Sequence, residues 1–221
     1  MRLNYWSKAA RCARADKLFR AALESLKSGE LAIDCGANIG EFTLPMAQTG
    51  ADVIAFEPDP EIFKRLEAAL NGQPNAELYA AAVSTQAGSV RLIRSPYFAE
   101  DMIAESLKST ILPEARTRNH NGRWREMDHE NYVDVPMVNL IELLEKQIAK
   151  RGQIELLKID IEGAELDILE AMLAKNLFAN IGLTVVEMHE FRFPHTAPRI
   201  RKVQKAIRRL HPPKKVNFDW R

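Results

Sequence analysis

Three ionisable residues lie two positions apart in the run LLKIDIEGAE, residues 156–165: Lys158, Asp160 and Glu162. Alternate side chains of a β-strand share a face, so a strand here would present Lys158 and Asp160 together. A positioned carboxylate can remove a proton from a hydroxyl group. We expect Asp160 to be the first candidate for such a base and Glu162 the second, with Lys158 orienting Asp160 or contacting the acceptor. The alternative is that both acids cap the helix that opens at Gly163.

A second group of candidates stands in VVEMHE, residues 185–190. Glu187 and His189 share strand parity and would emerge at the same sheet edge as Asp160. The ordinary pKa of histidine is near neutrality, so His189 could be a competing base, or it could have a structural hydrogen-bonding role. Together with Asp160 and Glu162, these side chains also offer oxygen and nitrogen ligands for a divalent ion such as Mg²⁺. We expect no metal to be needed.

The run LAIDCGANIG, residues 31–40, joins a short apolar strand to a turn with two glycines. Such a turn lets a ligand approach the backbone at a helix start. The dinucleotide fingerprint G-x-G-x-x-G fails here, because Asn38 and Glu41 occupy two of its glycine positions. Glu57 ends the next apolar run, where an acid accepts from ribose hydroxyls. These residues predict a nucleoside ligand without a pyrophosphate, and a cationic nucleoside such as S-adenosylmethionine suits the acidic surroundings.

Strand and helix patterns alternate along the chain and must position these candidates. A leading helix is expected over 7–27, and a helix over 59–72 begins with Asp59 as its N-cap and Pro60 as its first residue. The run AELYAAAVS, residues 76–84, is expected to be the third strand. This alternation predicts an α/β fold with a doubly wound, mostly parallel sheet. Residues 95–131 break the pattern and are expected to form an insertion or lid before the fourth strand.

The composition is typical of a single globular domain over residues 1–221, with an N-terminal helical extension at 1–29. The sequence has no apolar run of membrane-spanning length, no secretory signal core and two cysteines, so we expect a cytoplasmic location. Residues 192–221, expected to be a basic helix and strand, hold ten Lys/Arg and one Asp, and residues 1–20 hold six Lys/Arg and one Asp. Solvated helix faces explain these basic ends; the alternatives are an anionic substrate, nucleic acid or a membrane surface.

Five blocks of the sequence together resemble the FkbM family of S-adenosylmethionine-dependent methyltransferases: LAIDCGANIGEFTLPMA, VIAFEPDPEIFKRLEAAL, ELYAAAVSTQAGSVRL, LLKIDIEGAELDILEAM and TVVEMHE. The resemblance implies a Rossmann-like, seven-stranded sheet, S-adenosylmethionine as cofactor, and methyl transfer to a hydroxyl of a small acceptor such as a sugar, glycan or natural-product intermediate. No nucleic-acid partner is expected. The alternatives are an RNA-binding or RNA-modifying protein and a non-catalytic nucleoside-binding scaffold.

The resemblance and the residue pattern together assign roles around the cofactor. The loop beneath its methionine and ribose parts would consist of Asp34, Gly36, Ala37, Asn38 and Gly40. Asp34 would lie near the cationic end of the cofactor, and Glu57 would accept from the ribose diol. Pro58 would shape the turn beside the adenine, which Ala82 and Val83 would contact. An ordinary turn, a capping acid and plain core packing are the alternatives for the loop, for Glu57 and for the Ala82–Val83 pair.

Two further features concern the acceptor. Members of the family commonly carry an aspartate where this chain has Asn139, which leaves acceptor specificity or a helix cap open at that position. The segment SLKST, residues 106–110 of the expected insertion, could help to close over the cofactor. The sequence does not identify the acceptor or the oligomeric state.

Overall fold

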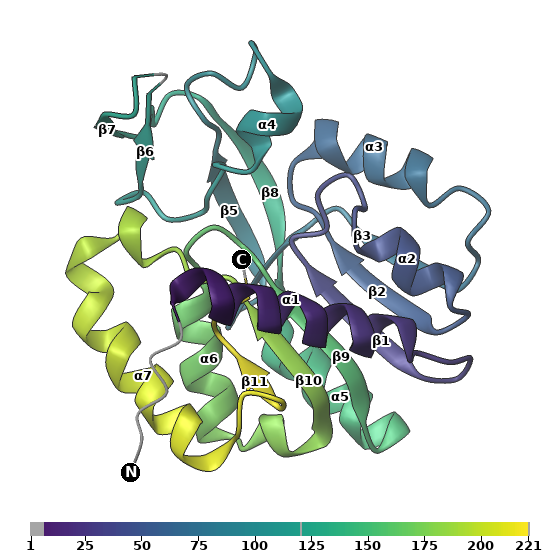
Figure 1. The fold of residues 1–221 in the computed structure, drawn as a ribbon. Coiled ribbons are helices and arrows are strands. Elements are labelled where there is room, and N and C mark those ends of the chain that lie inside the picture. Colours follow the sequence, from purple (N-terminus) through teal and green to yellow (C-terminus); the bar gives the residue numbers. More distant parts are fainter. Residues whose placement is uncertain (1–6, 120, 221) are drawn as a thin grey trace.

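The computed structural model describes residues 7–119 and 121–220, so parts of the expected terminal segments and of the insertion lie outside the described residues. Its central sheet is parallel throughout (Figure 1). In spatial order the six strands are β11 (Val216–Asn217), β10 (Ile181–Val186), β9 (Ile154–Ile159), β1 (Leu31–Cys35), β2 (Asp52–Phe56) and β3 (Ala76–Tyr79). This is the doubly wound order of Rossmann-like folds. The expected fold class is therefore confirmed, with six strands in the central sheet where seven were expected.

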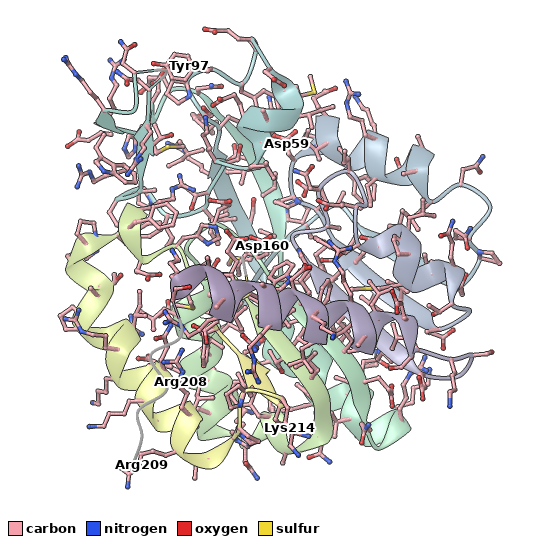
Figure 2. The ribbon with its side chains drawn as sticks, in the orientation of Figure 1. Asp59, Tyr97, Asp160, Arg208, Arg209 and Lys214 are labelled. Carbon is pink, nitrogen blue, oxygen red and sulfur yellow. The ribbon has the colours of Figure 1, made fainter. Side chains whose placement is uncertain are left out.

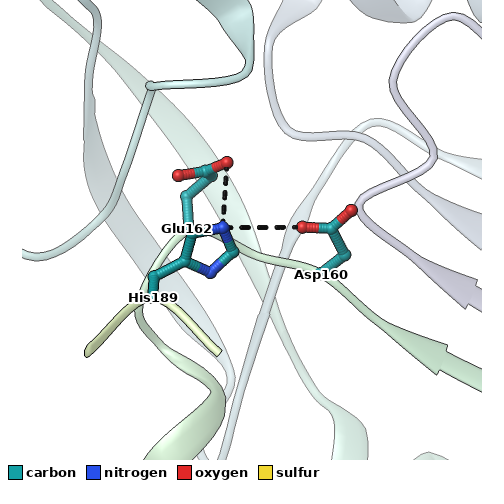
Figure 3. A group of neighbouring side chains, drawn as sticks. All are labelled: Asp160, Glu162 and His189. Carbon is teal, nitrogen blue, oxygen red and sulfur yellow. Dashed lines mark ion pairs between the residues drawn. The ribbon is translucent and has the colours of Figure 1, made fainter. Parts of the chain in front are cut away.

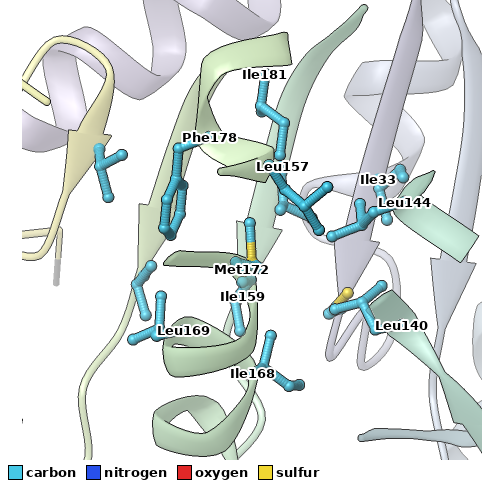
Figure 4. Close-up of a cluster of buried hydrophobic side chains, with 14 of the residues drawn as sticks. Ile33, Leu140, Leu144, Leu157, Ile159, Ile168, Leu169, Met172, Phe178 and Ile181 are labelled. Carbon is cyan, nitrogen blue, oxygen red and sulfur yellow. The ribbon is translucent and has the colours of Figure 1, made fainter. Parts of the chain in front are cut away.

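Helices cover both faces of this sheet (Figure 1). One face packs against α1 (Lys8–Glu24), α2 (Thr43–Gln48) and α3 (Pro60–Ala69). The other packs against α5 (Leu140–Arg151), α6 (Glu165–Ala174) and α7 (Ala197–Leu210). Figure 4 shows the second core, in which Leu157 and Ile159 of β9 meet Met172 of α6 and Leu144 of α5. The strands are apolar on both faces because both are covered.

Local sequence signals explain where the helices begin and which face they bury. Asp59 caps α3 by accepting from the amide of Glu61 at 2.9 Å, and Pro60 is the first helical residue, as predicted. Asn139 caps α5 in the same way, which resolves one of the two options for that residue. In α7 the buried residues recur at helical spacing, so its basic residues face outward.

The expected third strand is split in two, which corrects the sequence prediction. The chain turns at Ala81, whose amide donates to the carbonyl of Tyr79 at 2.9 Å. Residues beyond the turn form β4 (Ala82–Ser84), which pairs with β8 (Tyr132–Asn139) in a second sheet. The third member of that sheet is β5 (Gly88–Ile93), antiparallel to β8. Ala82 and Val83 therefore belong to the smaller sheet.

The segment expected to be an insertion has its own short elements. They are α4 (Met102–Ser106) and a two-stranded ribbon of β6 (Arg116–Arg118) and β7 (Trp124–Glu126). Three short 3-10 helices lie nearer the C-terminus: η1 (Leu177–Asn180), η2 (Glu190–Arg192) and η3 (Pro194–Thr196). The ribbon and α4 stand above the carboxyl edge of the central sheet (Figure 1).

The C-terminal segment closes the sheet and the first core. β11 adds the edge strand that the sequence suggested, and Trp220 is fully buried between Phe19 of α1 and Phe42, with ring centroids 5.1 and 5.5 Å away. Within residues 7–119 and 121–220, no helix combines the length and apolar character that a bilayer crossing demands.

Candidate active site

The candidate residues gather where the strand order reverses. β1 and β9 are neighbours, but the chain continues from β1 to β2 on one side and from β9 to β10 on the other. The loops that leave such a pair diverge and open a crevice at the carboxyl edge, where α/β sheets bind ligands. The two loops also touch, since the amide of Asp160 donates to the carbonyl of Cys35 at 3.0 Å.

Gly36 is the point of closest approach between these loops. Its φ is +83°, and a Cβ there would collide with the backbone carbonyl oxygen of Asp160. The predicted glycine requirement at this turn therefore has two physical causes. Gly40, also at positive φ, packs toward Leu66 of α3 and Leu70 at the C-cap of that helix. It does not line the cavity that opens beside these loops.

A buried ion pair fixes the turn from below. The Lys158 ammonium, 2% exposed, donates to Asp34 Oδ1 at 3.0 Å and to the carbonyl of Gly36 at 2.8 Å. Asp34 is fully buried and also accepts from Thr43 Oγ1 at 2.7 Å. Asp34 thus lies beneath the loop and outside the cavity lining, in contrast to its expected place beside the cationic end of the cofactor. The short strand β1 ends one residue later, which leaves Asp34 inside the sheet.

The charge of Lys158 also bears on Asp160. Burial by itself lowers the pKa of Lys158, but the carboxylates of Asp34 and Asp160 outweigh burial and raise it. Lys158 therefore keeps its charge and lies 3.6 Å from Asp160 Oδ2. Asp160 stands near the centre of the molecule, between the sheet edge and the insertion (Figure 2).

A first cavity extends from these loops toward β2 and β4. Most of the residues that sequence analysis assigned to the cofactor line it: Gly36, Ala37, Asn38, Glu57, Pro58, Ala82 and Val83. Lys158, Asp160 and Glu162 line it as well. Apolar side chains from Phe56, Leu92 and Ile111 complete its walls. The cavity is therefore polar near the β1 and β9 loops and apolar beyond them.

Glu57 stands at the wall of the first cavity and is 6% exposed. Its carboxylate accepts from the amide of Asn38 and from the amide of Asp59, each at 2.9 Å. Burial raises the pKa of Glu57 to about 7, although the two amide donors act in the opposite direction. Each carboxylate oxygen has a second lone pair that a ligand hydroxyl could use.

The segment 106–110 covers the first cavity. The side-chain amide of Asn38 donates to Ser106 Oγ at 2.8 Å, and Thr110 Oγ1 donates to the carbonyl of Glu162 at 2.8 Å. These contacts connect the insertion to both loops of the sheet edge. Ser109 also lines the cavity, and in the described part of the chain its buried hydroxyl has no hydrogen-bond partner.

His189 is surrounded by carboxylates (Figure 3). Its Nδ1 lies 2.9 Å from Glu165, and its Nε2 lies 3.2 Å from Glu162 and 3.8 Å from Asp160. Burial alone lowers the pKa of His189, but Glu165 and Glu162 outweigh burial and raise it well above its ordinary value. These carboxylates favour the protonated ring, which makes His189 a weaker candidate than Asp160 for the role of proton acceptor that the sequence left open.

Glu162 is held in an unusual conformation between two cations. It is a non-glycine residue with φ of +58°, a region that costs energy and is often found at functional sites. One carboxylate oxygen faces His189, and the other lies 2.5 Å from Arg192 Nη1. Both partners of Glu162 lie within hydrogen-bond distance, whereas the nearest cationic groups lie 3.6 and 3.8 Å from Asp160. Asp160 is therefore the stronger candidate for a base.

Two members of this network had no assigned role in the sequence analysis. Glu165 is 1% exposed, and its carboxylate also accepts from the amides of Ile161 and Gly163 at 3.1 Å. It is the last residue of the run LLKIDIEGAE, so the signal was present but pointed equally to helix capping. Arg192 follows the last motif block, and no residue pattern marked it.

The three ligand-type groups of Asp160, Glu162 and His189 lie within 4.8 Å of one another, a spacing that suits a metal ion. A histidine that binds a metal is neutral at the ligating nitrogen and often donates its other ring N–H to a carboxylate, and Glu165 stands beside Nδ1 in that position. That no metal is needed stays a prediction.

A second cavity lies beside the first, under the β6–β7 ribbon. Asp160, Glu162 and Leu107 line both cavities. Glu187 and His189 line the second cavity, as do Arg116, Arg118 and Trp124 of the ribbon. Asp160 and Glu162 thus stand at the boundary between the two cavities, and molecules bound in either cavity could contact them.

The fold defines a Rossmann-like α/β protein, and the first cavity opens at its topological switch point, where such folds bind ligands. The family profile described as "Methyltransferase FkbM domain" matches residues 34–210, so the chain belongs to this methyltransferase family.

Three known methyltransferases are similar to this chain. The 31-O-demethyl-FK506 methyltransferase FkbM of Streptomyces tacrolimicus is 32% identical over 187 residues, which cover 75% of this chain and 67% of that protein. Methyltransferase sdnD of Sordaria araneosa is 29% identical, covering 68% and 63%. The hexuronic acid methyltransferase AglP of Haloferax volcanii is 25% identical, covering 78% and 61%. The matched segments thus cover less than two thirds of sdnD and AglP.

Proposed function

We propose that this protein is an S-adenosylmethionine-dependent O-methyltransferase that acts on a hydroxyl of a small acceptor such as a sugar, glycan or natural-product intermediate. The observation that carries the proposal is the position of Asp160, on the shared wall of the first cavity, which Glu57 and apolar side chains line, and the second cavity. The names of the FkbM and AglP relatives, which refer to an O-demethylated compound and a hexuronic acid, support acceptors of this kind.

The first cavity fits the proposed cofactor on its own features. The Glu57 carboxylate is placed to accept from ribose hydroxyls, and apolar walls at Ala82 and Val83 suit the adenine ring. The buried hydroxyl of Ser109, unpartnered within the described residues, is free to bond a polar ligand or a water. Gly36 and Asn38 would hold the remaining part of the cofactor from the loop after β1.

The chain's own side chains can perform the accompanying proton transfer. S-adenosylmethionine, when bound, supplies an electrophilic methyl group. Asp160 would accept the proton of the acceptor hydroxyl, since its carboxylate faces the second cavity and lies within reach of an oriented substrate. Lys158, fixed by Asp34, holds that carboxylate from the other side, and the ring of His189 contacts Glu162. Lys158 and His189 thus act as positioning residues.

A test of this function is the release of S-adenosylhomocysteine from S-adenosylmethionine in the presence of hydroxylated acceptors. Each acceptor is paired with its analogue in which the hydroxyl is already methylated. Product that forms only with the free hydroxyl supports O-methyl transfer. Product that forms with RNA, and with none of the small acceptors, contradicts the proposed function.

Cofactor affinity is expected to rise with pH because of Glu57. The pKa of this carboxyl is raised to about 7, so the group is largely protonated at pH 6 and ionised at pH 8. Ribose hydroxyls favour the ionised form, so binding strengthens as pH rises through the pKa. We expect the affinity for S-adenosylhomocysteine to increase about tenfold between pH 6 and 8 by calorimetry. The E57Q variant should lose this increase; an identical pH profile in the variant would assign the effect to another group.

A further inference from the structure

The second cavity is lined by groups of both charges that come from different elements. Asp160, Glu162 and Glu187, with His189 among them, follow strands β9 and β10 at the carboxyl edge of the central sheet and form its acidic end. Arg116 and Arg118 line it from strand β6 of the ribbon. A molecule that fills this cavity therefore meets both carboxylates and guanidinium groups.

The two ribbon arginines differ from the other cations of the cavity. Arg192 is paired with Glu162, and Lys108 with Glu105. In the segments 7–119 and 121–220, neither Arg116 nor Arg118 has a carboxylate within ion-pair distance. Their charges are therefore available to an anionic group on a ligand, and guanidinium groups bind carboxylates and phosphates through paired hydrogen bonds.

An aromatic surface accompanies these charges. Trp124 lies opposite Arg118 in the β6–β7 pairing, so the two share a face of the ribbon. The guanidinium carbons of Arg118 and Arg116 lie 4.6 and 5.2 Å from the centre of the Trp124 ring. Phe191 lines the same cavity 5.9 Å from that ring and is 56% exposed, which is high for a large apolar side chain. The pair offers an apolar wall for a ring.

Buried contacts hold the ribbon in place over the cavity. Arg192, 3% exposed, donates through Nε to the carbonyl of Arg116 at 3.0 Å and through Nη2 to the carbonyl of Lys108 at 2.8 Å. The same guanidinium pairs with Glu162, so one side chain ties the ribbon to the loop after β9. The arginines of β6 are thus kept at a set position relative to Asp160.

The geometry points to an acceptor that is an anionic sugar. We propose that its carboxylate or phosphate binds Arg116 and Arg118, its ring packs against Trp124 and Phe191, and a free hydroxyl reaches the acidic end at Asp160. This inference rests on the proposed function and narrows its acceptor class. The basic C-terminal segment is a separate feature, because Arg208 and Arg209 of α7 and Lys214 beyond it lie away from Asp160 (Figure 2).

The test is calorimetric titration of the full chain with matched sugars. S-adenosylhomocysteine is titrated first and then kept saturating. The probes are p-nitrophenyl β-D-glucuronide against p-nitrophenyl β-D-glucoside, and glucose 6-phosphate against glucose. We expect the anionic member of at least one pair to bind about tenfold tighter than its neutral partner, since charge-assisted hydrogen bonds to guanidinium groups are stronger than neutral ones. The pair that shows the preference tells whether the anion is a carboxylate or a phosphate.

The double variant R116Q/R118Q should remove this preference and leave S-adenosylhomocysteine binding unchanged. The matched control is R123Q, because Arg123 lies in the loop that joins β6 to β7, is exposed and is outside the lining of the cavity. Neutral sugars that bind as well as the anionic ones, no binding of either anionic sugar, or a preference that persists in the double variant would overturn the proposal. Failure of S-adenosylhomocysteine to bind would instead contradict the proposed function.

Discussion

The D160N variant is expected to turn over about 10²- to 10⁴-fold more slowly than the wild type, the range that a positioned general base contributes. Asparagine keeps the size of the side chain but cannot accept the proton at this position. Lys158 retains Asp34 and the carbonyl of Gly36 as partners, so the turn beneath the cofactor is preserved. Steady-state rates with a saturating acceptor measure the loss, and calorimetry with S-adenosylhomocysteine should show affinity within about twofold of the wild type.

D134N is the matched control for this substitution. Asp134 is an exposed residue of β8 and lines neither cavity, so its variant should have wild-type turnover. If D160N retains wild-type turnover, Asp160 is not the base. If E162Q instead shows a loss of turnover of about 10²- to 10⁴-fold, the base is Glu162.

The K158M variant is expected to have a free energy of unfolding about 3–5 kcal/mol lower than the wild type. The substitution leaves the carboxylate of Asp34, which is fully buried, without its cation. An unpaired buried charge costs far more than the pair contributes when intact. The methionine also removes the donor that holds the carbonyl of Gly36. Urea denaturation followed by circular dichroism measures the change.

K175M provides the comparison for the same residue types at the surface. Lys175 pairs with Glu145 at 2.7 Å, but both side chains are more than two-fifths exposed. Exposed pairs contribute about 0–1 kcal/mol, so K175M should unfold near the wild-type midpoint. Equal destabilisation by the two variants would show that the Lys158 pair has no special structural role.

The positions that define the sheet edge could be predicted because local rules decide them. Asp59 and Pro60 set the start of α3 through local contacts, with Asp59 as the N-cap and Pro60 as the first helical residue. The parity of Lys158 and Asp160 follows from strand geometry, and both line the first cavity as that parity suggested. Glu57 lies beside the turn at Asn38 because the two residues follow neighbouring parallel strands, β2 and β1, at the same edge of the sheet.

The burial of individual site residues and the charge of His189 could not be predicted in the same way. Periodicity places Asp34 on a face of its strand, but only the register of β1 with β9 shows that Lys158 reaches it. The charge of His189 depends on Glu165, which packs against it from the start of α6. Arg192 acts across 76 residues to reach the carbonyl of Arg116, and no local pattern encodes such a contact. Long-range pairing decides these features.

The most direct measurement is calorimetric titration of the purified protein with S-adenosylmethionine, S-adenosylhomocysteine and NAD, each with and without EDTA. We expect both adenosyl compounds to bind with one-to-one stoichiometry, EDTA to leave this binding unchanged, and NAD not to bind. The E57A variant should bind both adenosyl compounds more weakly, because Glu57 is the residue placed to accept hydrogen bonds from the ribose hydroxyls. Absence of adenosyl binding to the wild-type protein would contradict the assignment of the first cavity and of the methyltransferase activity built on it.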